Sequence, residues 1–209
     1  MDAIIQAMES TIAARDPYTV AHQQRTAHLA CLIGSELDLA EADLQDLHVA
    51  GRLHDLGKIA VPGEILAKLG RLTEFEFSLI KIHPQVACGI LRPLKFKAHI
   101  NQIMLQHHER LNGSGYPLGL REGDIVLEAR ILAVADVVEA MYSHRPYRPA
   151  LGLEQALTEI TQFKGTLYDA EVVEACIRVM TRTGGFSVIT DRDLISGPKL
   201  GPASNMRLI

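Results

Sequence analysis

Histidine and aspartate side chains recur along this sequence at points where a helix is expected to end or to face the interior. Imidazole and carboxylate groups together suit divalent ions such as iron, manganese and zinc. The side chains of neighbours such as His54 and Asp55 point away from a helix in different directions. Each side chain can therefore bind a different one of two adjacent ions, or the carboxylate can bridge both ions. Two adjacent ions clamp the attacking and leaving oxygens in phosphoryl transfer, which is the chemistry that this pattern favours. The set comprises His22, His54, Asp55, His83, His107, His108 and Asp136.

Taken singly, each of these residues has a plainer interpretation. A lone histidine on a helix face is usually a structural or surface residue, and a glycine-rich stretch is usually a turn. Asp136 is less ordinary, because it lies in the apolar stretch 131–138, where a carboxylate is costly to bury unless it is paired or metal-bound. The ordered combination therefore favours a metal site. The plainer interpretation is kept for His28, His48, His99 and His144.

The segments that must position these residues have the period of helices, and none shows the alternation of a strand. An all-α fold is therefore predicted. Thr73 and Glu76 form a capping box at the start of one helix, and Pro84 suits the first turn of the next. A loop is expected from Pro62, and a second over 113–119. The main helices are expected over about 19–37, 40–56, 73–82, 97–108, 127–142, 153–163 and 169–181.

The two ends of the chain differ from this central part. Met1, Ile5, Met8 and Ile12 form a coiled-coil-like stripe, which predicts either a homodimer through this helix or packing against the domain. After Gly184 the sequence has no period and is expected to be a loosely held tail. The predicted division is an N-terminal helix over 1–15, a catalytic domain over 16–182 and an irregular tail over 183–209.

Composition excludes some classes of function. The net charge of -4 argues against broad nucleic-acid binding, so DNA is not an expected partner. The cysteines are isolated, as in a protein of the reduced cytoplasm, and they are Cys31, Cys88 and Cys176. The sequence shows no signal peptide and no apolar run of membrane-spanning length, so a cytoplasmic location is expected.

Several strings together, spread over roughly residues 16–179, resemble the HD-GYP family of metal-dependent phosphohydrolases. They are Asp16-Pro17-Tyr18-Thr19 with His22, His54-Asp55-Leu56-Gly57-Lys58, His83-Pro84, His107-His108-Glu109, Gly113-Ser114-Gly115-Tyr116-Pro117, Ala135-Asp136-Val137 and Arg145-Pro146-Tyr147-Arg148. The resemblance implies an HD-domain helical bundle with a Gly-Tyr-Pro loop and a C-terminal helical extension. It also implies hydrolysis of the cyclic dinucleotide c-di-GMP to linear pGpG or GMP, often downstream of a sensory or receiver domain.

The resemblance also implies roles for individual residues. The seven histidines and aspartates would bind two divalent ions, with Asp55 bridging; iron or manganese is favoured, and zinc, nickel, cobalt and magnesium also fit. A hydroxide made available by the metals would attack phosphorus, with Asp55 and Lys58 as catalytic residues. Lys58 would contact one phosphate of the substrate, and Arg145 and Arg148 would bind the second phosphate. Without the motif, the preferred interpretation of all three residues would be solvated surface charge. Tyr116 would line the nucleotide pocket.

Three positions depart from the family pattern. Some members carry a glutamate one turn before the equivalent of His22, which gives a third metal; Tyr18 stands there, so a two-metal site is favoured. Asn112 replaces a common aspartate before the Gly-Tyr-Pro loop and loses its charge. Val138-Glu139-Ala140 replaces Phe-Asp-Ala, a conservative difference near the site.

Two other functions remain open at this point. One is an HD phosphohydrolase that acts on another cyclic or linear nucleotide. The other is a catalytically weak or inactive module that signals through protein partners by its Gly-Tyr-Pro face. The complete ligand set argues against the inactive module.

Overall fold

The computed structural model describes residues 2–14, 17–94, 96–143 and 150–186. These residues form helices joined by loops, with only two isolated β-bridges, so the predicted all-α class is confirmed. The α-helices are α1 Asp2–Ala13, α2 Pro17–Glu36, α3 Glu41–Leu53, α4 Gly63–Leu66, α5 Glu74–Lys81, α6 His83–Leu91, α7 Ala98–Gln106, α8 Leu127–Tyr142, α9 Leu153–Gln162 and α10 Ala170–Thr183. Short 3-10 helices occur at η1 Leu56–Ala60, η2 Arg92–Leu94 and η3 Glu122–Asp124.

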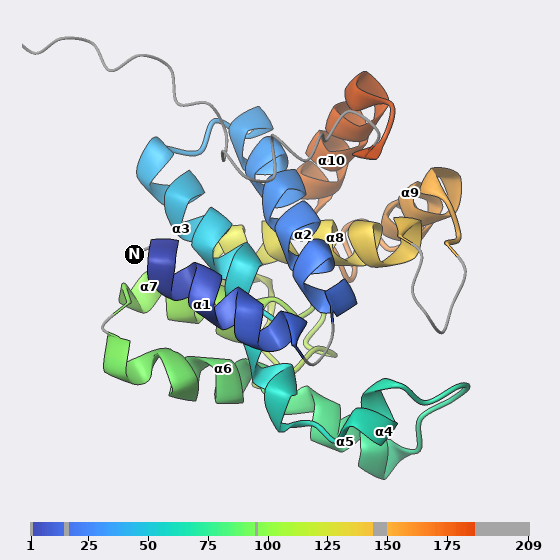
Figure 1. Cartoon of the computed structure of the whole chain (residues 1–209). Coiled ribbons are helices and arrows are strands. Elements are labelled where there is room, and N and C mark those ends of the chain that lie inside the picture. The colour runs from blue at the N-terminus through green and yellow to red at the C-terminus, as the bar shows by residue number, and fades with distance from the viewer. Residues whose placement is uncertain (1, 15–16, 95, 144–149, 187–209) are drawn as a thin grey trace, which may run out of the picture.

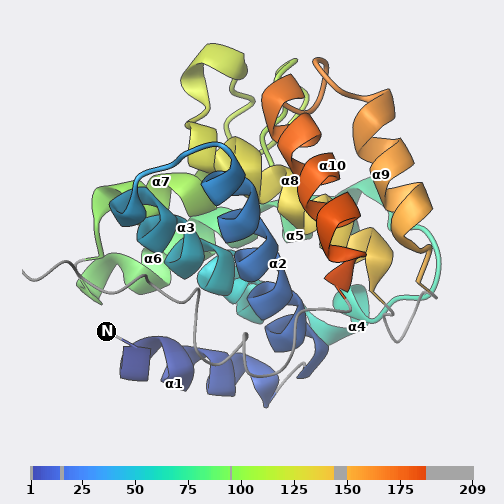
Figure 2. The ribbon, with the colours of Figure 1, turned by 90° about the horizontal axis from the view of Figure 1, so that it is seen from above.

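Helices α2 and α8 form the centre of the bundle (Figure 1). Helix α2 packs on α3, α8 and α10, and it buries the predicted face that carries Thr26, Leu29 and Ile33. Helix α8 is apolar nearly all round because it contacts α2, α3, α7, α9 and α10. The C-terminal helices α9 and α10 lie on the side of the bundle away from α6 and α7 (Figure 2).

Helix α1 packs against its own domain. Ile5 and Ile12 are buried and contact the core that α2 and α3 share. Between them, the buried Glu9 accepts a hydrogen bond of 2.8 Å from Arg52 Nε on α3. The N-terminal stripe thus takes the second of the two predicted arrangements, and the homodimer stays a prediction.

Several predicted boundaries were wrong by a few residues, most of them beside the candidate site. Helix α3 ends at Leu53, three residues early, so His54 and Asp55 lie in the break before η1. Helix α7 ends at Gln106, so His107 and His108 also lie beyond a helix end. A single helical turn, α4, occurs where a loop was expected, because one turn is too short to show a period in sequence.

The capping box predicted at the start of α5 is confirmed. Thr73 caps α5: its hydroxyl accepts from the Glu76 backbone N–H at 3.2 Å, and the Glu76 carboxylate accepts from the Thr73 N–H at 2.7 Å. Gly184, with φ of 65°, ends α10 in the left-handed conformation. No helix among the described residues is long and apolar enough to cross a membrane. His144, Arg145, Arg148 and the tail over 187–209 lie outside the described residues.

Candidate metal centre

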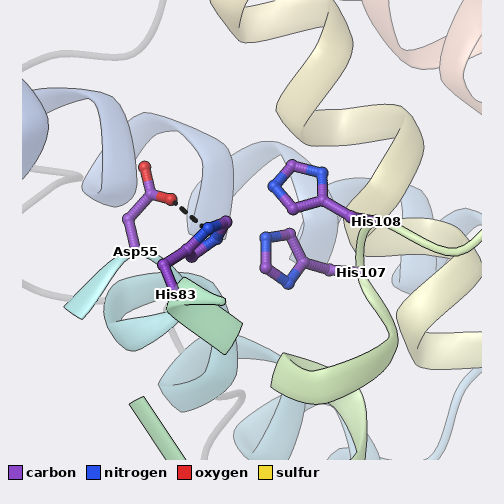
Figure 3. A group of neighbouring side chains, drawn as sticks. All are labelled: Asp55, His83, His107 and His108. Carbon is purple, nitrogen blue, oxygen red and sulfur yellow. Dashed lines mark ion pairs between the residues drawn. The ribbon is translucent and has the colours of Figure 1, made fainter. Parts of the chain in front are cut away.

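The seven histidines and aspartates singled out from the sequence come together where α2, α3, α6, α7 and α8 meet. They form two groups, and within each group one donor atom per residue lies within 4.8 Å of the others. The Asp55 group consists of Asp55, His83, His107 and His108 (Figure 3). The His22 group consists of His22, His54 and Asp136.

Three of the histidines are oriented by the backbone. The Nδ1 atoms of His54, His83 and His107 lie 2.7, 2.8 and 2.6 Å from a carbonyl oxygen three residues earlier in the chain. A carbonyl can only accept, so Nδ1 carries the proton and Nε2 of the neutral ring keeps a lone pair. All three Nε2 atoms are buried and have no hydrogen-bond partner. The acceptors are the carbonyls of Gly51, Ile80 and Met104.

The Asp55 carboxylate faces both groups. Its Oδ1 lies 3.4 Å from His83 Nε2, and its Oδ2 lies 3.6 Å from His54 Nε2 and 3.9 Å from His22 Nε2. Oδ1 is buried without a hydrogen-bond partner, whereas Oδ2 accepts from Lys58 Nζ at 2.6 Å. Burial raises the pKa of Asp55, but the positive charges of Lys58 and the neighbouring histidines outweigh it and hold that pKa well below its usual range. The group is a carboxylate at neutral pH.

His22 is oriented by a carboxylate. Its Nε2 lies 3.1 Å from Asp136 Oδ1, and its Nδ1 contacts Glu139 Oε2. Burial alone would lower the pKa of His22, but the hydrogen bonds to Asp136 and Glu139 raise it to about 9. Glu139 is itself fully buried and accepts from Arg25 Nε at 2.6 Å and Ser143 Oγ at 2.5 Å.

Sequence reasoning missed this role of Glu139 and treated it only as a difference from the family. The available signal was its place three residues after Asp136, which puts both carboxylates on one face of α8. A second buried carboxylate in an apolar helix needs a partner as much as the first.

Burial keeps three other histidines of the cluster neutral. It lowers the pKa of His83 to about 4 and holds the pKa of His107 and His108 well below its usual range. Metal coordination requires a deprotonated imidazole nitrogen, and these rings supply it at neutral pH. Five imidazoles and two carboxylates, several of them with buried donor atoms that have no hydrogen-bond partner, fit divalent transition-metal ions.

The Gly-Tyr-Pro loop is anchored beside the cluster by Glu109. The buried carboxylate of Glu109 accepts the backbone N–H groups of Leu118 at 2.6 Å, Gly119 at 3.2 Å and Leu120 at 2.9 Å. A Cβ at Gly115 would lie only 2.4 Å from Glu109 Cα, so glycine is required for the loop to fold back onto it.

Tyr116 and Lys58, predicted to contact substrate, both lie at the edge of the cluster. The ring of Tyr116 lies 4.6 Å from that of His108 and 6.0 Å from that of Phe77. Burial raises the pKa of Tyr116, so its hydroxyl stays protonated. The Lys58 side chain is 25% exposed and opens toward solvent from the Asp55 carboxylate. Arg145 and Arg148 lie outside the described residues.

Gly57 explains how η1 approaches α6 so closely. A Cβ at this position would lie 1.9 Å from the carbonyl oxygen of His83, a distance that no side chain tolerates. The glycine therefore lets the backbone that follows Asp55 lie directly on the backbone of His83, which brings their side chains into one group.

Comparison with known proteins is consistent with this geometry. The sequence model of the HD domain matches residues 6–172. The chain is 42% identical over 166 residues to the cyclic di-GMP phosphodiesterase response regulator RpfG of Xanthomonas campestris pv. campestris, which covers 78% of this chain and 44% of that protein. It is 41% identical over 169 residues to a cyclic di-GMP phosphodiesterase of Thermotoga maritima, which covers 79% of this chain and 45% of that protein. The chain thus spans less than half the length of these relatives.

A solved structure shares the fold at low sequence identity. The HDG"Y"P protein Bd1817 of Bdellovibrio bacteriovorus aligns with a TM-score of 0.65 at 20% identity, over 78% of this chain and 52% of that one. The helical arrangement is therefore that of a known fold. With the family model, the relatives and the Gly-Tyr-Pro loop in agreement, this chain belongs to the HD domain family, in its HD-GYP branch.

Proposed function

We propose that this chain is the catalytic part of a metal-dependent phosphodiesterase that hydrolyses c-di-GMP to linear pGpG, GMP or both. The observation that carries the proposal is the convergence of seven donor residues, among which the Nε2 atoms of His54, His83 and His107 and Oδ1 of Asp55 are buried without a hydrogen-bond partner. The substrate rests on the two relatives, each named a cyclic di-GMP phosphodiesterase.

The proposed cofactor is a pair of divalent ions, iron or manganese in preference to zinc, nickel, cobalt or magnesium. The Asp55 group would hold one ion and the His22 group the other, with Asp55 bridging, because its two oxygens face different groups. When bound, such a pair supplies hydroxide near neutral pH and neutralises charge on the phosphate. The donor set has no glutamate in place of Tyr18, so a two-metal site remains the proposal.

The protein's own side chains would position the substrate. Hydrolysis adds water across one P–O3′ bond: the hydroxide oxygen joins phosphorus, and the 3′ oxygen leaves and takes up a proton. Lys58, next to Asp55 and partly exposed, would neutralise the non-bridging oxygens of the attacked phosphate. Tyr116, protonated and packed on His108, would line the pocket for a base. By family resemblance, Arg145 and Arg148 would bind the second phosphate.

The wider setting of the chain is proposed on the same resemblance. Residues 16–182 would be the catalytic domain of a cytoplasmic signalling protein, and α1 its link to a sensory or receiver domain. A homodimer through α1 would have to use the face opposite Ile5 and Ile12, on which Ile4 is 43% exposed.

The direct test is turnover by protein loaded anaerobically with iron or manganese. A panel of c-di-GMP, another cyclic dinucleotide, a cyclic mononucleotide and a dNTP separates the proposed activity from other HD phosphohydrolases. We expect c-di-GMP to be cleaved fastest and Asp55→Ala to be inactive. His48→Gln, a half-buried histidine of α3 outside both groups, serves as the matched control and should keep activity. Metal-loaded wild-type protein that binds c-di-GMP without cleaving it would contradict the proposal and indicate a signalling module.

A further inference from the structure

A third group of metal-ligand side chains lies away from the candidate centre. Asp43, His99 and Glu128, here called the outer triad, place one donor atom each within 4.8 Å of the others. Each residue comes from the first turn of a different helix, namely α3, α7 and α8. These same helices lead to the donors of the buried cluster, which lie further along them at His54-Asp55, His107-His108 and Asp136.

The spacing of the outer triad is that of ligands around an ion. His99 Nε2 and Glu128 Oε1 are 3.4 Å apart. A good N–H···O hydrogen bond spans only about 2.7–3.2 Å. Two ligands that are each about 2.0–2.2 Å from a tetrahedral zinc ion lie roughly 3.4 Å from one another. The separation of the imidazole and the carboxylate thus matches that of two ligands of one tetrahedral ion.

The local charge also favours a cation. The outer triad contributes two carboxylates, and Lys97, two residues before His99, is paired with a further carboxylate, Asp46, at 2.7 Å. Acidic residues in a first helical turn are favourable without any metal, because they face the positive end of the helix dipole. That explanation covers Asp43 and Glu128, but it does not account for an imidazole from a third helix within 4.8 Å of both.

We propose that the outer triad binds one divalent transition-metal ion of the zinc type, separate from the ions of the buried cluster. His99 and Glu128, with side chains 33% and 13% exposed, supply an accessible imidazole and carboxylate, and Asp43 supplies the third ligand. Water would complete the coordination. The bound ion would join the first turns of α3, α7 and α8. The ion would lie about 12 Å from the donors at His107 and Asp136, because eight residues of helix span roughly that length.

The test is the number of zinc ions that each chain retains after loading and dialysis, measured by elemental analysis. His99→Gln removes the imidazole and should retain one ion fewer than the wild type. Glu122→Gln changes an exposed acid in η3, just before α8, and should retain the wild-type number. Zinc should also raise the melting temperature of the wild type further than that of His99→Gln, by roughly 5 °C at saturating metal.

These readouts do not depend on hydrolysis of any nucleotide, so they stand apart from the proposed phosphodiesterase activity. If His99→Gln loses its helical circular dichroism, Asp43→Asn replaces it, since that side chain is partly exposed. Equal zinc content in the wild type, His99→Gln and Asp43→Asn would overturn the proposal. An equal loss in Glu122→Gln would also overturn it, because that result would show unspecific binding to surface acids.

Discussion

Within the buried cluster, His22 is oriented by other means than the histidines that bind the backbone. His83 and His107 of the Asp55 group, and His54 of the His22 group, donate Nδ1–H to backbone carbonyls, which never change charge. In the His22 group, His22 points Nδ1 at the buried carboxylate of Glu139. The same residue type is thus fixed three times by a neutral partner and once by an ionised one.

This difference sets the charge of each ring before any metal binds. Burial lowers the pKa of His83 to about 4, so the ring is neutral at neutral pH. The carboxylates of Asp136 and Glu139 outweigh burial and raise the pKa of His22 to about 9, so that ring carries a proton. The Asp55 group is therefore ready to coordinate an ion, whereas the His22 group must first release a proton.

The largest expected effect comes from Asp55, because its carboxylate faces both groups. Asp55→Ala should lower kcat for c-di-GMP by at least about a thousandfold and reduce the bound metal. Measurement of kcat together with metal content per chain checks this. Asp55→Ala with wild-type turnover and full metal content would show that the two groups do not share this ligand.

The second prediction concerns the neutral ring of His83 in metal-free protein. Its folded pKa of about 4 lies below the ordinary value near 6.5, so between these values the unfolded chain binds a proton that the folded chain does not. The free energy of unfolding should therefore fall as pH falls from about 6.5 to 4, by about 3 kcal/mol from this residue. Urea unfolding across this range gives the slope.

His83→Gln is the matched variant for that measurement, because it removes the titrating ring and keeps a polar side chain. Its stability should fall less steeply between about pH 6.5 and 4. The slope does not vanish, because burial lowers the pKa of His107 and His108 in the same direction. An identical slope in variant and wild type would contradict the assignment of a neutral, buried ring.

Glu139→Gln tests the ionised half of the comparison. Loss of the charge should lower the pKa of His22 toward its usual value and weaken metal affinity by about tenfold to a hundredfold. Fewer protons should then be released when metal binds near neutral pH, and calorimetry in buffers of different ionisation enthalpy counts them. A change in affinity without a change in proton release would show that Glu139 supports the fold but does not set the charge of His22.

Most of the fold and the donor set could be predicted from sequence because they depend on local patterns. The apolar period located α8, and the Thr73–Glu76 capping box located the start of α5. The break after Leu53 could not be predicted, because it depends on contact between η1 and α6 across Gly57, which are distant in sequence. The helical period of the sequence continues through such a break and therefore does not reveal it.

The partners of the donors were also beyond the sequence. Glu139 and Arg25 are separated by more than a hundred residues, and only the packing of α2 on α8 brings them together. The sequence leaves His99 as an ordinary structural or surface histidine for the same reason, since Asp43 and Glu128 reach it from other helices. Spacing in the sequence identifies residues that are neighbours on one helix, but not residues of three different helices that meet in space.

The smallest expected effect comes from Ser143, which contacts Glu139 and not the proposed metal ligands themselves. Its hydroxyl donates to Glu139 Oε1 at 2.5 Å, while Arg25 holds the same oxygen at 2.6 Å. Ser143→Ala removes one of these two donors, so it should cost about 1 kcal/mol of stability and change kcat for c-di-GMP by less than about fivefold. Urea unfolding and steady-state kinetics measure both. A loss as large as that of Glu139→Gln would show that Ser143, rather than Arg25, fixes the carboxylate that orients His22.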